Sequence, residues 1–109
     1  MASYSFLLTY SVSPYTETDR VHQNQAARLR QKLNRVEIED WVKLETVETA
    51  FKGVVHLSET TITQKRNEAE NIAWNQIKGV MDSLGVYKET TVHVAMMVQE
   101  LGDLIEFKL

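Results

Sequence analysis

Two histidines lie on strand-like segments where their side chains could share one surface. His56 lies in the alternating stretch Lys52–Ser58 and His93 lies in Thr90–Gln99. With one strand between theirs, the two Cα atoms would start about 10 Å apart. Two histidines can serve as base and acid in RNA cleavage through the 2′-hydroxyl group. We therefore keep both as candidate catalytic residues, with two isolated surface histidines as the alternative.

Other catalytic and cofactor chemistry finds little support in the residue types. The chain has no cysteine, which excludes thiolate metal sites, iron–sulfur clusters and cysteine nucleophiles. It contains no H-x-x-x-H, H-E-x-x-H or D-x-D-x-D pattern, and its four glycines form no phosphate-binding loop. We expect no metal and no cofactor, and a non-catalytic protein, with enzymatic activity left open by the histidines.

Basic residues are concentrated in one segment. Residues 1–36 contain five basic and two acidic residues, whereas residues 37–109 contain seven basic and thirteen acidic ones. Arg28, Lys32 and Arg35 recur at helical spacing and would form a stripe beside the apolar face of their helix. Such a stripe could follow the phosphates of a nucleic acid. The alternative is an ordinary solvated helix face.

An acidic segment with a tryptophan follows directly. Glu37, Glu39 and Asp40 precede Trp41, and tryptophan is a common residue at the centre of protein interfaces. If Trp41 is exposed among these carboxylates, the patch would bind a basic partner. The alternative is that Trp41 is partly buried at the boundary of its own domain.

The elements that would position these residues follow from hydrophobic periodicity. Period-two alternation predicts strands, and apolar residues at helical spacing predict two helices. Thr61 and Gln64 have the spacing of a capping box, and Gly85 stands where a helix-terminating glycine belongs. Gly79 inside the second helix suggests close packing there. The predicted strands are Ser3–Val12, a segment around Trp41–Thr46, Lys52–Ser58, Thr90–Gln99 and Leu104–Leu109, and the helices are Asp19–Arg35 and Thr63–Leu84.

This order predicts one α+β domain over residues 1–109. A βαββαβ unit of this kind is the ferredoxin-like arrangement, with an antiparallel sheet, two helices on one face and here a short additional C-terminal strand. The first and third strands would lie in the middle of the sheet. The other face of the sheet would be open, and alternation assigns to it Ser5, Leu7, Thr9, Ser11, Lys43, Glu45, Lys52, Val54, His56, Thr91, His93, Ala95 and Met97.

The open face and the terminal strand suggest self-association. Leu7, Val54 and Met97 make the open face more apolar than a solvated surface requires. Phe107 and Leu109 add apolar surface on an edge strand, where another chain can pair. We expect a homodimer through one of these surfaces. The alternative is a monomer whose terminal hairpin folds back on its own sheet.

Two families share features with this sequence. Lys52-Gly53 resembles the start of the RNA-recognition motif, but Val54 and His56 stand where that family has stacking aromatics. In element order, nearly the whole chain resembles the small CRISPR-associated ferredoxin-fold nucleases and the antitoxin endoribonucleases of similar shape. That resemblance implies a small dimeric domain. The nucleases carry a metal-binding aspartate at the end of the first strand, where this sequence has Tyr10-Ser11-Val12-Ser13, so no catalytic residue carries over.

Three hypotheses for function follow. The first is a non-catalytic regulatory module of the inhibitor, immunity or antitoxin type, dimeric and bound to a macromolecular partner, with a protein partner expected and nucleic acid possible. The second is an RNA- or single-stranded-DNA-binding protein, or a small endoribonuclease, using the basic helix and the histidines. The third is a dimeric αβ barrel that encloses a ligand pocket. The apolar runs are too short for a membrane span, the N-terminus has no signal-peptide pattern and cysteine is absent, so we expect a cytoplasmic protein without a membrane partner.

Overall fold

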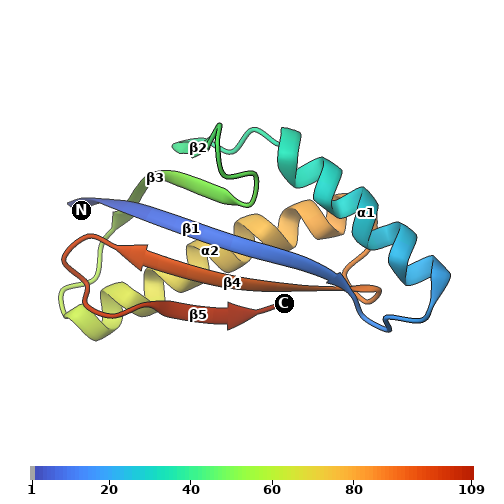
Figure 1. The fold of residues 1–109 in the computed structure, drawn as a ribbon. Helices are drawn as coiled ribbons and strands as arrows, with labels where there is room; N and C mark the ends of the chain where they lie inside the picture. The colour runs from blue at the N-terminus through green and yellow to red at the C-terminus, as the bar shows by residue number, and fades with distance from the viewer. Residues whose placement is uncertain (1) are drawn as a thin grey trace.

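The computed structural model describes residues 2–109 as an α+β structure with two helices and a five-stranded antiparallel sheet (Figure 1). The strand order is β2-β3-β1-β4-β5. None of the helices described is both long and apolar enough to cross a membrane. The elements are β1 (Ala2–Pro14), α1 (Arg20–Arg35), β2 (Trp41–Lys43), β3 (Ala50–Leu57), α2 (Ile62–Leu84), β4 (Thr90–Val98) and β5 (Ile105–Lys108).

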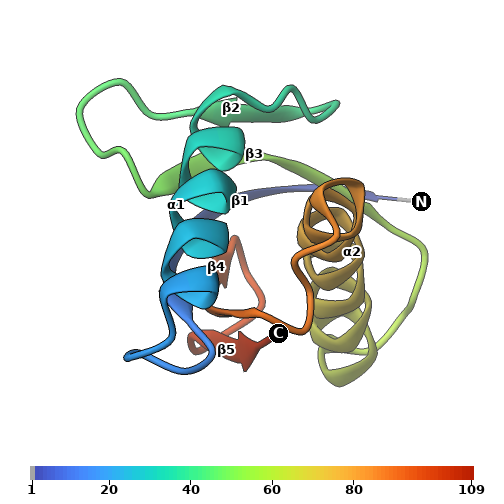
Figure 2. The same ribbon diagram turned by 90° about the vertical axis from the view of Figure 1, so that its right-hand side faces the viewer.

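Both helices pack on the same face of the sheet, and the other face is open (Figure 2). Strand β1 shows this most clearly, because Phe6, Leu8 and Tyr10 are buried while Leu7 and Thr9 between them are exposed. From the helices, fully buried apolar side chains close the core over β1 and β4. These helix residues are Ala26, Leu29, Leu33, Ala69, Ala73, Ile77 and Met81. Removal of these side chains from water is the main stabilising contribution to the fold.

The ends of α2 confirm the local signals in the sequence, whereas α1 is capped by a residue that those signals did not single out. Asp19 is the N-cap of α1, and its carboxylate accepts a hydrogen bond from the backbone N–H of His22 at 3.1 Å. Thr61 and Gln64 form the predicted capping box of α2. Gly85 ends α2 in the left-handed conformation, with φ of 67°. The close packing expected at Gly79 is wrong, because a β-carbon there would meet nothing within 4 Å.

Strand β2 is shorter than predicted and presents the opposite face. Only Trp41–Lys43 pair with β3, with Trp41 opposite Gly53 and Lys43 opposite Phe51. Directly paired residues lie on the same face of a sheet, so Lys43 lies on the helix-covered side with the buried Phe51. Val42 takes the place on the open face that the alternation assigned to Lys43. A one-residue difference in register is enough to exchange the two faces.

Candidate functional site

The two candidate histidines lie at opposite ends of the central strand. His56 is paired with Ser3 of β1, and His93 is paired with Ser11 of the same strand. Eight residues of β1 separate these positions, about 26 Å at roughly 3.3 Å per residue. The prediction of a shared catalytic pair is therefore wrong. Counting strand spacing alone ignored the register along β1, which contributes most of the separation.

His56 instead belongs to a chain of polar contacts. Its Nδ1 lies 2.9 Å from the Ser3 hydroxyl oxygen, and its Nε2 lies 3.0 Å from Oδ2 of Asp40. Serine, histidine and aspartate in this sequence of contacts are the groups of nucleophilic hydrolases. Here the side chains of His56 and Asp40 are both about half exposed, so water competes for every contact and screens the charges. The arrangement lacks the enclosed, dry surroundings in which such a chain activates a serine.

Asp40 is positioned by an unusual backbone conformation. It has φ of 67°, which few residues other than glycine and asparagine or aspartate adopt. Its carbonyl oxygen accepts a hydrogen bond from the N–H of Val54 at 3.0 Å, across the missing side chain of Gly53. The glycine of the Lys52-Gly53 pair is thus required by local packing. A glycine inside a strand was a signal for such a close approach, but the sequence did not show which backbone approaches.

His93 lines a shallow depression on the open face, next to β5. The depression has a volume of about 550 Å³ and several hydroxyl and charged groups in its wall. Within residues 2–109, the His93 ring makes no side-chain hydrogen bond, and no group of three or more histidine or acidic side chains is placed to hold a metal ion. The polar side chains that line the depression are Thr9, Ser11, Thr49, His93, Glu106 and Lys108.

A lysine–tyrosine pair that the sequence analysis missed lies under the β2–β3 hairpin. The Lys43 ammonium group donates a hydrogen bond to the Tyr10 hydroxyl, which in turn donates to the carbonyl oxygen of Glu48 at 3.3 Å. Burial, and secondarily the Glu48 carboxylate, raises the pKa of Tyr10 to about 12. Burial lowers the pKa of Lys43. Its ammonium group lies 4.5 Å and 4.7 Å from the ring centres of Tyr10 and Phe51. Lys43 therefore packs on two core aromatic rings through cation–π contacts.

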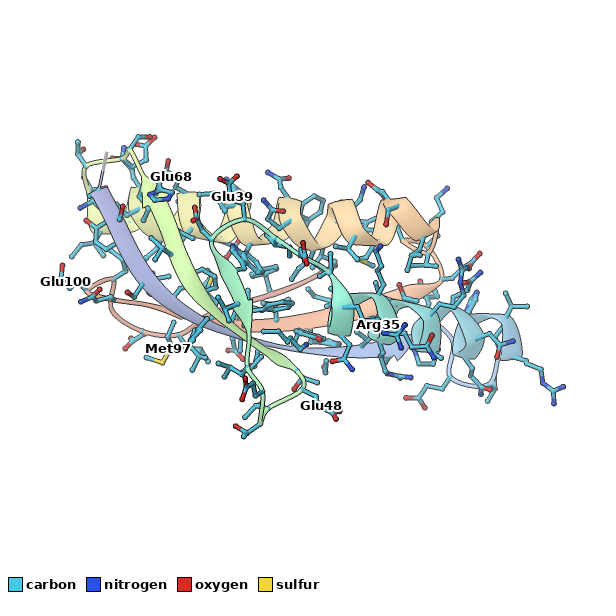
Figure 3. All side chains as sticks on the ribbon, turned by 90° about the horizontal axis from the view of Figure 1, so that it is seen from above. Arg35, Glu39, Glu48, Glu68, Met97 and Glu100 are labelled. Atoms are coloured by element: carbon cyan, nitrogen blue, oxygen red, sulfur yellow. The ribbon has the colours of Figure 1, made fainter. Side chains whose placement is uncertain are left out.

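The basic stripe is exposed on α1, as helical spacing predicted. Arg28, Lys32 and Arg35 all reach solvent, and within residues 2–109 the one side-chain hydrogen bond among them joins Arg28 to Gln25 in the same helix. Arg30 points the other way, where its guanidinium donates twice to the carbonyl oxygen of Val12, at 2.9 and 3.2 Å. Figure 3 shows Arg35 on α1, and Glu39 and Glu48 on the loops on either side of β2.

Trp41 is part of the core, which corrects its candidate role in an exposed docking patch. The side chain is only 8% exposed and packs edge-on against Phe6 and Phe51, with ring centres 5.1 and 5.4 Å apart. Glu37, Glu39 and Asp40 are exposed, but the tryptophan beside them offers a partner almost no surface. The large apolar ring of Trp41 packs between two core aromatic rings, which removes it from water. The sequence pattern did not decide between burial and exposure of this side chain.

The exposed apolar surface of the sheet instead forms a row across four strands. Met97 is paired with Leu7, Leu7 with Lys52 and Lys52 with Val42, so one residue from each of β4, β1, β3 and β2 stands in line. Leu7, Val42 and Met97 are 45%, 55% and 52% exposed. We call the line formed by Met97, Leu7, Lys52 and Val42 the apolar row, after its three apolar members. Figure 3 shows Met97 on the side of the sheet away from α2.

No family model matches this chain, and no curated protein or solved structure matches it.

The terminal-strand candidates Phe107 and Leu109 are half-buried, and both pack against the core on the helix side. They therefore contribute to the edge of the sheet and not to its open face. The apolar row therefore holds three of the large apolar side chains that the structure leaves exposed, and two of them, Leu7 and Met97, are directly paired.

Proposed function

We propose that this protein is a small non-catalytic interaction module, of the inhibitor, immunity or antitoxin type, that binds a protein partner on the open face of its sheet. The observation that carries the proposal is the apolar row. Leu7 and Met97 are directly paired on the neighbouring strands β1 and β4, and Val42 stands in the same line on β2, beyond Lys52 of β3. All three apolar side chains are about half exposed. Contiguous exposed apolar area on a small domain is typical of a binding surface.

The row also indicates what the partner must offer. Lys52 is exposed and stands inside the row, paired with both Leu7 and Val42. A lysine in such a place can pack its apolar stem on neighbouring side chains and keep its ammonium group in water. A matching surface would be apolar with a carboxylate near its centre, because an interface buries charge at low cost only when it is paired. Serine and threonine hydroxyls along β1 would form a polar rim.

Site-specific photo-crosslinking in cells tests this proposal. A benzophenone amino acid at position 97 or 7 is expected to give an adduct heavier than the chain and unlike a second copy of it. The matched control carries the same group at Val21, an exposed apolar position on α1. Equal adducts from both positions, or none from the sheet positions, would overturn the proposal. An adduct of twice the chain mass from position 97 would make this face a contact between copies instead.

We also infer the finer features of the molecule. The order β2-β3-β1-β4, with a helix after β1 and after β3, supports a ferredoxin-like unit to which β5 is added beside β4. The exposed β5 edge supports a homodimer. The absence of cysteine from 109 residues supports the cytoplasm as its location.

Nucleic-acid binding is the second candidate, and the exposed stripe on α1 is the observation that favours it. Anisotropy of a labelled single-stranded RNA, measured at about 50 and about 200 mM salt, should show affinity falling more than tenfold if roughly three phosphates are engaged. Binding lost in the Arg28→Ala/Lys32→Ala/Arg35→Ala variant and kept in Lys88→Ala would support this candidate. No binding at low salt would remove it.

An endoribonuclease or a barrel pocket that uses both histidines is not proposed. The positions of His56 and His93 lie eight residues apart along β1.

A further inference from the structure

The edge strand β5 has a self-complementary sequence. Figure 1 shows β5 at the lower edge of the sheet, and β4 is its one neighbouring strand among the described residues 2–109. Around Phe107, residues 105–109 run apolar, acidic, aromatic, basic, apolar. In an antiparallel pair of two such strands centred on Phe107, each Glu106 would lie opposite a Lys108, and each Ile105 opposite a Leu109.

The backbone of β5 is arranged to accept such a strand. Leu109 and Val92 exchange two hydrogen bonds, at 2.9 and 3.1 Å. Because hydrogen-bonded pairs alternate along an antiparallel ladder, Phe107 also bonds toward β4, whereas the N–H and C=O groups of Glu106 and Lys108 point away from it. The outward N–H and C=O groups thus belong to Glu106 and Lys108, the same two residues whose charged side chains would lie opposite each other in a pair of β5 strands. An uncovered row of such groups is a template for another strand.

We propose that two copies of this chain form a dimer by antiparallel pairing of β5 with β5, about a two-fold axis at Phe107. The proposal rests on the homodimer inferred above and says where the second copy binds. Four backbone hydrogen bonds would join Glu106 of each copy to Lys108 of the other, and two Glu106–Lys108 charge pairs would lie on the open face. On the helix side the two half-buried Phe107 rings would meet and complete each other's burial.

This dimer would complete the depression beside His93. Glu106 and Lys108 line that depression, and each would then lie next to the corresponding pair of the second copy. The depression would become a site with residues from both chains. The two sheets would join into one, with all four helices on the same face and an uninterrupted open face on the other.

Charge reversal tests the pairing. Glu106 and Lys108 are exposed, so their replacement leaves the core untouched. Sedimentation equilibrium is expected to give twice the 12.6 kDa chain mass for the unaltered protein. Glu106→Lys alone or Lys108→Glu alone changes two symmetric pairs at once and should weaken dimerisation by roughly tenfold or more. The double variant Glu106→Lys/Lys108→Glu restores both pairs and should return the dimer to near its original affinity.

A cysteine at the axis gives an independent measurement. The natural chain has no cysteine, so Phe107→Cys places a single thiol at the proposed two-fold axis, where β-carbons approach closely enough for a disulfide. Mild oxidation should link this variant into dimers faster than the control Val42→Cys, whose thiol lies on the opposite edge strand.

Each outcome decides the proposal. A monomer at all concentrations, or a dimer unaffected by Glu106→Lys, would overturn β5 pairing. A dimer dissociated by Leu7→Lys and not by Glu106→Lys would place the contact on the open face instead. In the crosslinking experiment, a heavier partner bound at position 97 of a monomeric protein would support the interaction module while excluding this dimer.

Discussion

The carbonyl oxygen of Asp40 occupies the space next to Gly53 where a side chain would begin. An ideal β-carbon on residue 53 would lie 2.1 Å from that oxygen and 2.9 Å from a ring carbon of Phe6. The same oxygen accepts the hydrogen bond of the Val54 N–H. The α1–β2 loop therefore rests on β3 only because residue 53 has no side chain, and the Asp40 carboxylate reaches His56 as a result.

Gly53→Ala should destabilise the protein by about 2–3 kcal/mol, because backbone on one side and a buried ring on the other leave a methyl group no room. Urea unfolding followed by circular dichroism measures this difference. Gly79→Ala is the matched control: its β-carbon meets nothing, and the change from glycine to alanine in a helix should stabilise by about 0.5–1 kcal/mol. Equal effects of the two substitutions would contradict the packing described at Gly53.

Arg66→Ala should loosen the β4–β5 connection. The Arg66 guanidinium donates hydrogen bonds to the carbonyl oxygens of Leu101, Asp103 and Leu104, at 2.8 Å for Leu101 and 3.3 Å for Leu104. Loss of hydrogen bonds from a charged donor should cost about 1.5–3 kcal/mol. Amide hydrogen exchange should become faster in β5 and remain unchanged in β3. Arg66→Lys should restore little, because an ammonium group cannot reproduce the fork of donors.

Tyr10 should make stability depend on pH in the alkaline range. The folded-state pKa of Tyr10, about 12, lies above the ordinary value of 10.0. Its contribution to the free energy of unfolding is therefore complete below pH 10 and is lost as the pH rises toward 12. Lys43, whose pKa is lowered by burial, acts in the opposite direction as it loses its proton. The free energy of unfolding of Tyr10→Phe, subtracted from that of the natural protein, isolates the Tyr10 contribution. A difference that stays constant from pH 9 to 12 would refute this assignment.

The two histidines should respond independently to substitution. His56→Ala removes contacts to Ser3 and Asp40, but these lie on exposed surface and should contribute less than about 1 kcal/mol. His93→Ala should change stability by less than about 0.5 kcal/mol, since the exposed ring makes no side-chain hydrogen bond within residues 2–109. The double variant should show the sum of the two effects, because residues this far apart do not couple. Chemical denaturation measures all three variants, and a coupling above about 0.5 kcal/mol would contradict the separation along β1.

Local chemistry in the sequence was enough to predict the elements and most of their ends. Alternation along β1 and β4, the helical spacing in α1 and α2, the Thr61 cap and Gly85 all depend on neighbours within a few residues. The mixed α+β class and the exposed stripe of Arg28, Lys32 and Arg35 follow from the same short-range patterns. These features needed no knowledge of which strands meet.

Tertiary structure alone decided where the candidate residues meet. Register along β1 separated His56 from His93, and a one-residue difference in β2 turned Lys43 toward Tyr10 and left Val42 exposed. Periodicity cannot specify the register of β1, because an alternating strand satisfies its own pattern in any register that differs by two residues. In β2 the exposed Val42 and half-buried Lys43 run against the apolar pattern itself, so the pairing with β3 decided which face each takes. The choice between such registers comes from packing distant side chains together and from close contacts such as Asp40 on Gly53, which exist only once the chain is folded.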